Sequence, residues 1–370
     1  MTGARLIQRR DEWNALVLTS PHVDFRQSWQ WGAARVSHGW AVVRAAVVAG
    51  EIALAAAQVL VRRLPGLGRI LYAPRGPLLA AQDTGAAEAL RAVVEYLRQQ
   101  TGGIFVRVSP GPEAGDALAP LAETGFVALP ERWSLWNTPR NVMRLDLTGS
   151  ERDLLARMTR KRRQHISTAA RRRITTTIAT DLPSLRVFHR LHVEHGRRQN
   201  YPVPPWPALV ALHREFAPDD GLAVVSGRVA GELAGMLVGI RFGPVAHTLY
   251  VATTPAARRT AAGELLHWEL IRWARAGGCR TLDLGSSCTD VPPTPADPHY
   301  GIYRFKRELG AELSLCVGYH DCVFTPWRYR LARLLERQAR HVDRRLLGRL
   351  RASRPGADDA VPAATLEHAS

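Results

Sequence analysis

Hydrophobic and polar positions in the first 130 residues follow two different periods. Apolar residues recur at helical spacing over residues 11–18 and 28–36, which predicts two short helices. Two apolar runs, 41–49 and 52–61, are joined by a Gly-Glu turn and predict a β-hairpin. The remaining elements of this half are predicted in the order strand, helix, strand, helix, strand, at residues 69–73, 86–99, 104–108, 116–124 and 126–129.

The second half repeats this order. A strand at 142–147 precedes a helix for which Ser150 and Asp153 have the spacing of a capping box. A helix at 185–198 follows, and a proline-rich loop at 201–205 separates it from the next hairpin. The later elements are a hairpin (222–229 and 233–240), a strand (247–252), a helix (262–276), a strand (281–284), a helix (302–309), a strand (312–319) and a basic helical tail.

The two halves overlay at a short repeated sequence. Leu71-Tyr72-Ala73 and Leu249-Tyr250-Val251 each follow a hairpin and precede a helix and a strand, which indicates duplicated domains. This order is also the core order of the GNAT acyltransferase fold. We therefore expect an α/β (α+β) protein with two tandem GNAT-like domains, whose mixed sheets are flanked by helices, and with a cleft between them. The predicted parts are 1–140, 141–325, a basic amphipathic helix at 326–354 and a disordered tail at 355–370, with the domain boundary in the polar stretch 131–140.

Composition fits a globular protein, because 46% of the residues are hydrophobic and 22% are charged. The four cysteines are too few for a disulfide scaffold, and none forms a CxxC pair, so we expect reduced thiols and no structural zinc. The N-terminus lacks the apolar segment of a secretory signal, and no run of about 18 apolar residues occurs. These features predict a cytoplasmic protein.

The net charge of +17 comes almost entirely from arginine. Only Lys161 and Lys306 are lysines among the 50 basic residues, a bias that GC-rich codons alone can produce. The basic residues gather at 152–173 and 328–354. Such clusters favour anion-binding faces for RNA or anionic lipid, although a solvated helix face has the same composition.

A short motif near the C-terminus is the sharpest chemical feature. Tyr303-Arg304-Phe305-Lys306-Arg307, followed by Gly310, begins a predicted helix after a proline-rich loop. An ammonium is a compact point donor, whereas a guanidinium is a wide fork that stays protonated. A chain that uses arginine nearly everywhere but has lysine here suggests a role that arginine cannot fill, such as stabilising charge on a carbonyl oxygen.

This motif resembles the C-terminal motif of the FemABX family of aminoacyl-tRNA-dependent peptidyl transferases. Other segments resemble the family's patterns in the same order: Gln27-Ser28-Trp29-Gln30-Trp31 with Arg35, Ala73-Pro74-Arg75-Gly76-Pro77, the basic stretch 160–173, and Leu282-Asp283-Leu284-Gly285-Ser286. The resemblance covers about residues 25 to 320. It implies transfer of an aminoacyl group from aminoacyl-tRNA to an amine, which in the cell-wall members belongs to a muropeptide on a nucleotide or lipid carrier.

The resemblance also implies roles for single residues in catalysis. Lys306 would stabilise the tetrahedral intermediate, with Phe305 beside it and Tyr303 as a substrate-binding residue of the same motif. No general base stands out, and no cofactor is expected besides the aminoacyl-tRNA co-substrate.

Further roles concern the acceptor. Arg35 stands where the family has a lysine that binds acceptor phosphate. Arg197 would be the second phosphate ligand, with Arg198 as its competitor because the alignment can slide by one position. Tyr201 and Tyr250 would lie in the cleft. The chain departs from the family in having no room for a coiled-coil arm between residues 205 and 218 and in having a histidine, His195, where a small hydroxyl residue is expected.

Two other functions stay open. The segment Arg258-Arg259-Thr260-Ala261-Ala262-Gly263 resembles the loop with which GNAT enzymes bind the pyrophosphate of acyl-CoA, but Ala261 replaces a glycine there. An acyl-CoA-dependent N-acyltransferase is therefore one alternative, and a non-catalytic basic binding protein on the same scaffold is another.

The C-terminal helix and the acidic residues of the proline-rich loop also allow more than one reading. The amphipathic helix at 326–354 can contact a membrane or RNA, or pack on its own domain. Asp283, Asp290 and Asp297 near His299 have irregular spacing. This pattern favours a polar substrate loop over a metal site.

Overall fold

The computed structural model describes residues 3–80, 85–112, 114–130, 141–169, 173–255, 257, 260–288 and 291–350. Met1–Thr325 form one compact unit, and the C-terminal helix α11 (Pro326–Leu350) belongs to a second. The predicted boundary at 131–140 and the predicted disordered tail at 355–370 lie outside the described residues. Among the helices that are described, none carries an apolar stretch of the length that crosses a bilayer.

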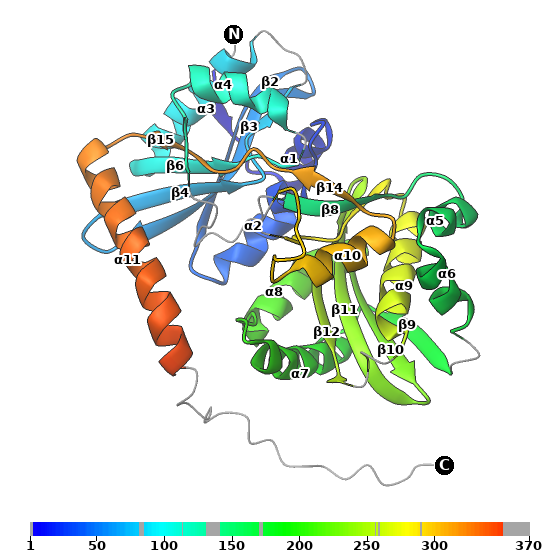
Figure 1. Ribbon diagram of the computed structural model, residues 1–370. Helices are drawn as coiled ribbons and strands as arrows, with labels where there is room; N and C mark the ends of the chain where they lie inside the picture. The colour runs from blue at the N-terminus through cyan, green and yellow to red at the C-terminus, as the bar shows by residue number, and fades with distance from the viewer. Residues whose placement is uncertain are drawn as a thin grey trace. The chain divides into compact units, whose positions relative to one another are not determined.

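The first sheet follows the predicted order of elements (Figure 1). Its strands are ordered β1-β2-β3-β4-β6-β15-β7, with β5 paired to β3. Among the described strands of this sheet, β4 and β6 are the pair that runs in parallel. The elements of the first half are α1 (Arg10–Leu18), α2 (Trp29–Val36), α3 (Ala86–Thr101), α4 (Leu118–Glu123), β1 (Arg5–Leu6), β2 (Ala41–Ala49), β3 (Ile52–Leu64), β4 (Gly68–Pro74), β5 (Leu78–Leu79), β6 (Gly103–Ser109) and β7 (Val127–Ala128).

The second sheet has the equivalent order, β9-β10-β11-β12-β13-β8-β14. Its parallel pair, β12 with β13, occupies the position of β4 with β6. The predicted capping box of α5 is present, because Ser150 and Asp153 bond each other's backbone N–H groups. The elements are α5 (Glu151–Arg157), α6 (Arg160–Ser167), α7 (Leu182–Gln199), α8 (Trp206–Phe216), α9 (Ala262–Ala276), α10 (Tyr300–Glu308), β8 (Asn141–Asp146), β9 (Ile174–Ala179), β10 (Leu222–Val229), β11 (Glu232–Phe242), β12 (Val245–Thr253), β13 (Thr281–Asp283), β14 (Glu312–Leu315) and β15 (His320–Val323).

Two strands connect the halves by exchange. The strand that follows β7 in the chain is β8, and it lies in the second sheet between β13 and β14. The strand that follows β14 is β15, and it lies in the first sheet between β6 and β7. The strand predicted at 312–319 is present but shorter: β14 ends at Leu315, and the next strand, β15, begins at His320 in the other sheet. Gly318, with φ +90°, lies between them and allows the chain to turn.

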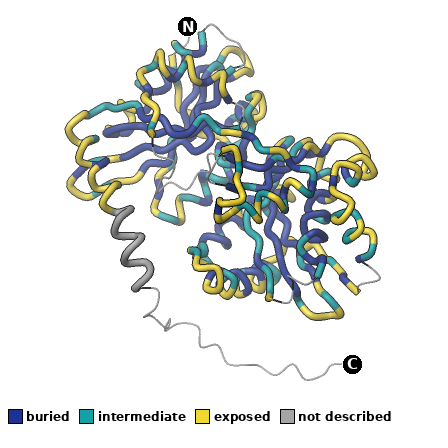
Figure 2. Tube along the Cα trace, viewed as in Figure 1, coloured by how far each residue is buried: buried dark blue, intermediate teal, exposed yellow. Residues whose placement is uncertain are grey.

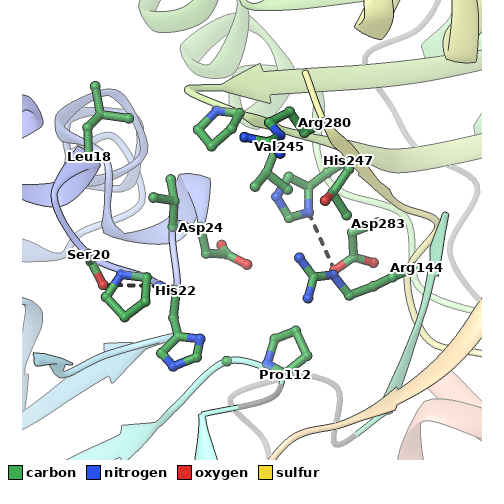
Figure 3. A pocket seen from close by; sticks show the side chains of 15 residues that line it. Leu18, Ser20, His22, Asp24, Pro112, Arg144, Val245, His247, Arg280 and Asp283 are labelled. Atoms are coloured by element: carbon green, nitrogen blue, oxygen red, sulfur yellow. Dashed lines mark hydrogen bonds and ion pairs between the residues drawn. The ribbon is translucent and has the colours of Figure 1, made fainter. Parts of the chain in front are cut away.

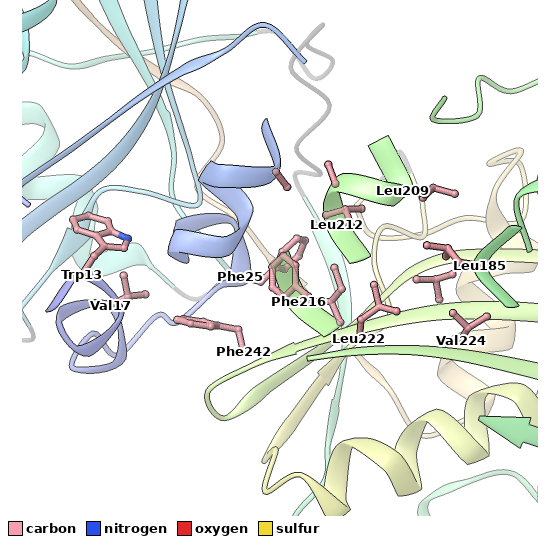
Figure 4. Close-up of a cluster of buried hydrophobic side chains, with 14 of the residues drawn as sticks. Trp13, Val17, Phe25, Leu185, Leu209, Leu212, Phe216, Leu222, Val224 and Phe242 are labelled. Atoms are coloured by element: carbon pink, nitrogen blue, oxygen red, sulfur yellow. The ribbon is translucent and has the colours of Figure 1, made fainter. Parts of the chain in front are cut away.

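A shared hydrophobic core joins the halves further (Figure 4). Trp13 and Phe25 from the first half are in the same buried cluster as Phe216 and Phe242 from the second. The ring of Phe25 contacts that of Phe216 with centroids 6.3 Å apart. Figure 2 shows buried segments running through both sheets. The contact between the halves is thus a packed core, which fixes the walls of any site formed there.

The two parallel strand pairs differ in length, and this difference creates the candidate site. β4 and β6 pair at six positions and stay together up to Pro74 and Ser109. β12 and β13 pair at only three, ending at His247 and Asp283, after which β12 continues to Thr253 paired with β11 on its other side. The backbone beyond Asp283 is therefore free to bond other groups.

Candidate functional site

Lys306 lies where β12 and β13 separate. It is buried on α10, with 8% of its surface exposed, and its Nζ donates to the carbonyl oxygens of Ser286 at 2.7 Å and Gly285 at 3.2 Å. Burial lowers the pKa of Lys306 to about 8, and the negative charge of Asp283 opposes that shift. An ammonium has three N–H donors, so these bonds leave one without a partner among the described residues. That donor is available to a developing oxyanion.

Phe305 is fixed on two sides. Its ring meets His267 of α9 edge-on, with centroids 5.2 Å apart, and the guanidinium of Arg162 lies 4.8 Å from its centroid. Arg162 in turn forms ion pairs with Glu264 of α9 and, at 2.7 Å, with Glu308 of α10. Burial lowers the pKa of His267 to about 4, so this ring is neutral at physiological pH. These contacts hold α6, α9 and α10 together around Phe305.

A cavity of about 240 Å³ brings two of the predicted acceptor residues together. Arg35 of α2 and Tyr250 of β12 line it with Trp31, and α8 closes another side. The guanidinium carbon of Arg35 lies 5.4 Å from the ring centroid of Trp31, and its Nε has no hydrogen-bond partner among the described residues. A half-buried cation with an unused donor against aromatic walls suits a phosphate joined to an apolar or ring-bearing group.

The other predicted acceptor residues lie outside this cavity's lining. The ring centroid of His192 lies 5.7 Å from that of Tyr201 and 5.3 Å from that of Tyr250. The ring of His192 therefore links the two tyrosines. Burial raises the pKa of Tyr201 to about 12. Arg197 and Arg198 are exposed at the end of α7, and Arg198 donates to the carbonyl oxygen of Thr253.

The predicted residues therefore form two groups. Lys306 and Phe305 make one, with the ring of Tyr303 tilted against Tyr300 at 5.8 Å on the same helix. Arg35 and Tyr250 make the other. The roles of all these residues remain predictions.

Sequence reasoning missed a buried polar cluster between the halves (Figure 3). Asp24, His247 and Asp283 line a cavity of about 320 Å³, and all three are buried. Arg75 is fully buried near them, with its Nε 3.7 Å from an oxygen of Asp24 and its Nη1 2.8 Å from the Sγ of Cys316. Asp283 also accepts the N–H of Gly285 at 2.6 Å, and thereby fixes a carbonyl that Lys306 uses.

The oxygen and nitrogen atoms of Asp24, His247 and Asp283 come within 4.8 Å of one another, as metal ligands can. We assign no ion there, because the guanidinium groups of Arg26 and Arg75 already neutralise the two carboxylates. His247 and the arginines outweigh the effect of burial and keep the pKa of Asp283 below its ordinary value.

The carboxylate of the proline-rich loop that the structure describes is that of Asp297. Asp297 accepts the backbone N–H of His299 at 2.7 Å, and Asp290 lies outside the described residues. Asp283 lies 3.6 Å from His247, and the Asp297 carboxylate bonds within its own loop.

The segment predicted to resemble an acyl-CoA loop is described only in part. Arg258 and Arg259 lie outside the described residues, and α9 begins at Ala262. Ala261 is fully buried directly before the helix, where a glycine would allow a ligand to approach the backbone.

Comparisons with known proteins agree with this geometry. The sequence profile described as the FemAB family matches residues 9–114, and that described as an acetyltransferase (GNAT) domain matches residues 155–307. The lipid II:glycine glycyltransferases of Staphylococcus saprophyticus and Staphylococcus aureus (strain MRSA252) are each 22% identical to this chain, over 86% of it and over 92% and 93% of their own lengths. The chain is thus similar to FemAB proteins in its first half and to acetyltransferase (GNAT) domains in its second.

A solved structure supports the FemABX fold independently of the sequence profiles. The crystal structure of FemX superposes with a TM-score of 0.78 at 18% identity, over 89% of this chain and 99% of that one. The expected α/β fold with two GNAT-like domains is confirmed. At this identity the superposition shows the fold of the chain and not its substrates.

Proposed function

We propose that this chain acts as FemABX enzymes do and moves an aminoacyl group from aminoacyl-tRNA to an amine acceptor in peptidoglycan cross-bridge or specialised-metabolite synthesis. Its match to the FemAB family, its GNAT domain and its glycyltransferase relatives support an acyltransferase that acts on an amine. The observation that carries the proposal is the position of Lys306, a buried ammonium with one unused donor beside the separating strands β12 and β13.

The chemistry suits such a site. An aminoacyl ester is already activated, so the acceptor amine attacks its carbonyl carbon, a C–N bond forms and the C–O bond to the ribose breaks. The amine loses a proton and the ribose oxygen gains one. Negative charge develops on the carbonyl oxygen in between, and Lys306 donates to it. Holding the ester and amine together supplies much of the remaining acceleration.

The cavity of Arg35 and Tyr250 fits the acceptor. The relatives are named for lipid II as their substrate, and a lipid-linked or nucleotide-linked amine carries phosphates beside an apolar or ring-bearing group. Arg35 would bind one phosphate with its unused donor. Arg197, which is exposed and has no ion-pair partner among the described residues, would bind a second when the acceptor is present.

Helix α11 would bring the protein to a membrane that carries such an acceptor. Trp327, Leu331, Leu334 and Leu335 recur at helical spacing and are 44 to 63% exposed. Arg328 and Arg330 are exposed on the same helix, as in helices that lie on anionic bilayers. We expect vesicles with anionic lipid to bind the full chain, and Leu331→Glu/Leu335→Glu to abolish binding. Equal binding by this variant would contradict membrane contact through α11.

The donor is tested by direct competition. Purified protein is incubated with a pool of charged tRNA or with acyl-CoA and an amine acceptor, and the loss of acyl group from each donor is measured. We expect loss from charged tRNA that depends on the acceptor. Loss from acyl-CoA alone would replace this proposal with the N-acyltransferase alternative. Tight RNA or lipid binding without turnover would support a non-catalytic binding protein.

A further inference from the structure

Helix α6 is tied at its start to the end of α10, the helix that carries Lys306. The backbone N–H of Thr159, just before α6, donates to the carbonyl oxygen of Glu308 at 3.0 Å. Arg162 of α6 pairs with the Glu308 carboxylate and lies over Phe305. The outer faces of α6 and α10 therefore adjoin the site where the ester carbonyl would be held.

The basic residues of α6 divide into two kinds. Arg162 is used within the fold, and Arg163 donates to carbonyl oxygens at the end of α5, including that of Ala156 at 3.2 Å. Arg160 and Lys161 are exposed and have no carboxylate partner among the described residues. Their charge is thus not needed to hold the helix in place.

Helix α10 adds two more exposed cations. Arg307 has no carboxylate partner among the described residues, and Arg304 lies 3.8 Å from Glu308, whose carboxylate already accepts from Arg162 at 2.7 Å. We call the four residues Arg160, Lys161, Arg304 and Arg307 the α6–α10 basic surface.

We propose that the α6–α10 basic surface binds the sugar-phosphate backbone of the donor RNA next to its aminoacylated 3′ end. This inference rests on the proposed function. With the ester at Lys306, the nucleotides that precede it would lie near Phe305, and the α6–α10 basic surface is carried by the two helices that meet at this ring. Arg160, Lys161 and Arg307 are exposed without a carboxylate partner among the described residues, and such cations bind phosphates and release counterions, which favours association with RNA.

The chemistry of α6 favours RNA over a lipid surface. Its exposed residues are Arg160, Lys161, Gln164 and Ser167, all polar. A helix that lies on a bilayer needs an apolar face as well as a basic one, and α6 directs no large apolar side chain outward. Phosphate contacts need only the cations.

The test uses the full chain and a hairpin RNA with the length of a tRNA acceptor stem. Arg160→Glu/Lys161→Glu changes two exposed residues that make no ion pair among the described residues, and its thermal melting is compared with wild type. The matched control, Arg63→Glu/Arg91→Glu, makes the same charge change at exposed positions of the first half. At physiological salt, we expect the α6 variant to bind the hairpin without an amino acid at least about tenfold more weakly than wild type. The slope of its affinity against salt concentration should fall by about one to two phosphate contacts. Both quantities should change less in the control.

Rates of aminoacyl transfer from two donors then distinguish RNA binding from the chemical step. We expect the α6 variant to lose transfer from the aminoacylated hairpin but to keep the wild-type rate with 3′-aminoacyl adenosine, which lacks the preceding phosphates. The inference is overturned if the α6 variant binds the hairpin as tightly as wild type, or if the control variant loses as much affinity. It is also overturned if the α6 variant loses binding to anionic vesicles but still binds RNA. If wild type transfers from neither donor, the proposed function fails, while hairpin affinity still decides the docking surface.

Discussion

Lys306 places its Nζ 2.7 Å from the carbonyl oxygen of Ser286, at the point where the chain has left β13. The bond fixes the direction of a buried ammonium against the backbone. A second bond, to Gly285, uses a carbonyl that the contact between Asp283 and the Gly285 N–H helps to hold. The donor is therefore positioned before any substrate arrives, as electrostatic stabilisation of a transition state requires.

Replacement of Lys306 should remove most of the activity. We expect Lys306→Ala to lower the single-turnover transfer rate by about 10²–10³-fold, the usual effect of losing one oxyanion donor. Lys306→Arg should restore little, because a planar guanidinium cannot take the two backbone bonds and the substrate oxygen in the same geometry. Arg63→Ala, at an exposed position of β3, is the control, and thermal melting checks that each variant folds. A Lys306→Arg variant as fast as wild type would contradict the proposed geometry.

The pH dependence should follow the ammonium. Since burial lowers the pKa of Lys306 to about 8 and the protonated form is the donor, the transfer rate should fall as pH rises through about 8. Of the groups that act on Lys306, Asp283 and Cys288 raise its pKa. His267, with a pKa of about 4, stays neutral over this range. Asp283→Asn removes a negative charge, so the falling limb should move to lower pH. A limb that stays in place or moves upward would argue against this assignment.

Arg35 should act on binding and not on chemistry. We expect Arg35→Ala to raise the KM for a phosphate-bearing acceptor by about tenfold or more with kcat nearly unchanged, because a charge-assisted hydrogen bond is lost. Arg35→Lys should recover much of this, since a point charge still attracts phosphate. An acceptor amine without phosphate serves as the control, and its KM should be the same for all three proteins. A fall in kcat alone would place Arg35 elsewhere in the reaction.

The pairing of β15 with the first sheet should contribute measurably to the free energy of unfolding. Arg107 of β6 and Asp321 of β15 form a buried bidentate ion pair at 2.7 and 2.8 Å, with side chains at most 1% exposed. Arg107→Met leaves a carboxylate buried without this partner, which typically costs about 3–5 kcal/mol of unfolding free energy. Urea denaturation measures the loss. Arg98→Met, which breaks an exposed pair with Glu95 in the same half, should barely move the midpoint. Equal shifts for both variants would show that the buried pair does not hold β15.

Local patterns predicted most elements but not their partners. The hairpins and the capping box at Ser150 follow from short-range chemistry, and the structure has them. The periodicity of residues 312–319 indicates extended backbone but cannot show that the chain then crosses to the first sheet, where β15 pairs with β6. The sequence analysis did not predict helix α8, because several prolines precede it and one, Pro207, lies inside it. Pro207 is in the first turn, where a proline is tolerated.

The candidate site was predictable only where a motif marked it. The scarcity of lysine and the motif around Lys306 identified that residue. The sequence could not show that Arg162 points inward onto Phe305 while its neighbours Arg160 and Lys161 are exposed. This difference depends on the packing of α6 against α9 and α10. Asp24, Arg75 and Asp283 come together only through the interface between the halves.

One single-turnover experiment addresses the proposed reaction itself. An RNA carrying a radiolabelled amino acid is mixed with excess enzyme and a lipid-linked or nucleotide-linked muropeptide amine, and the label is followed from RNA to acceptor. We predict acceptor-dependent transfer by the wild-type protein and transfer slowed by at least about 10²-fold in Lys306→Ala. Label that stays on the RNA while acyl-CoA is consumed, or a Lys306→Ala variant as fast as wild type, would contradict the proposed mechanism.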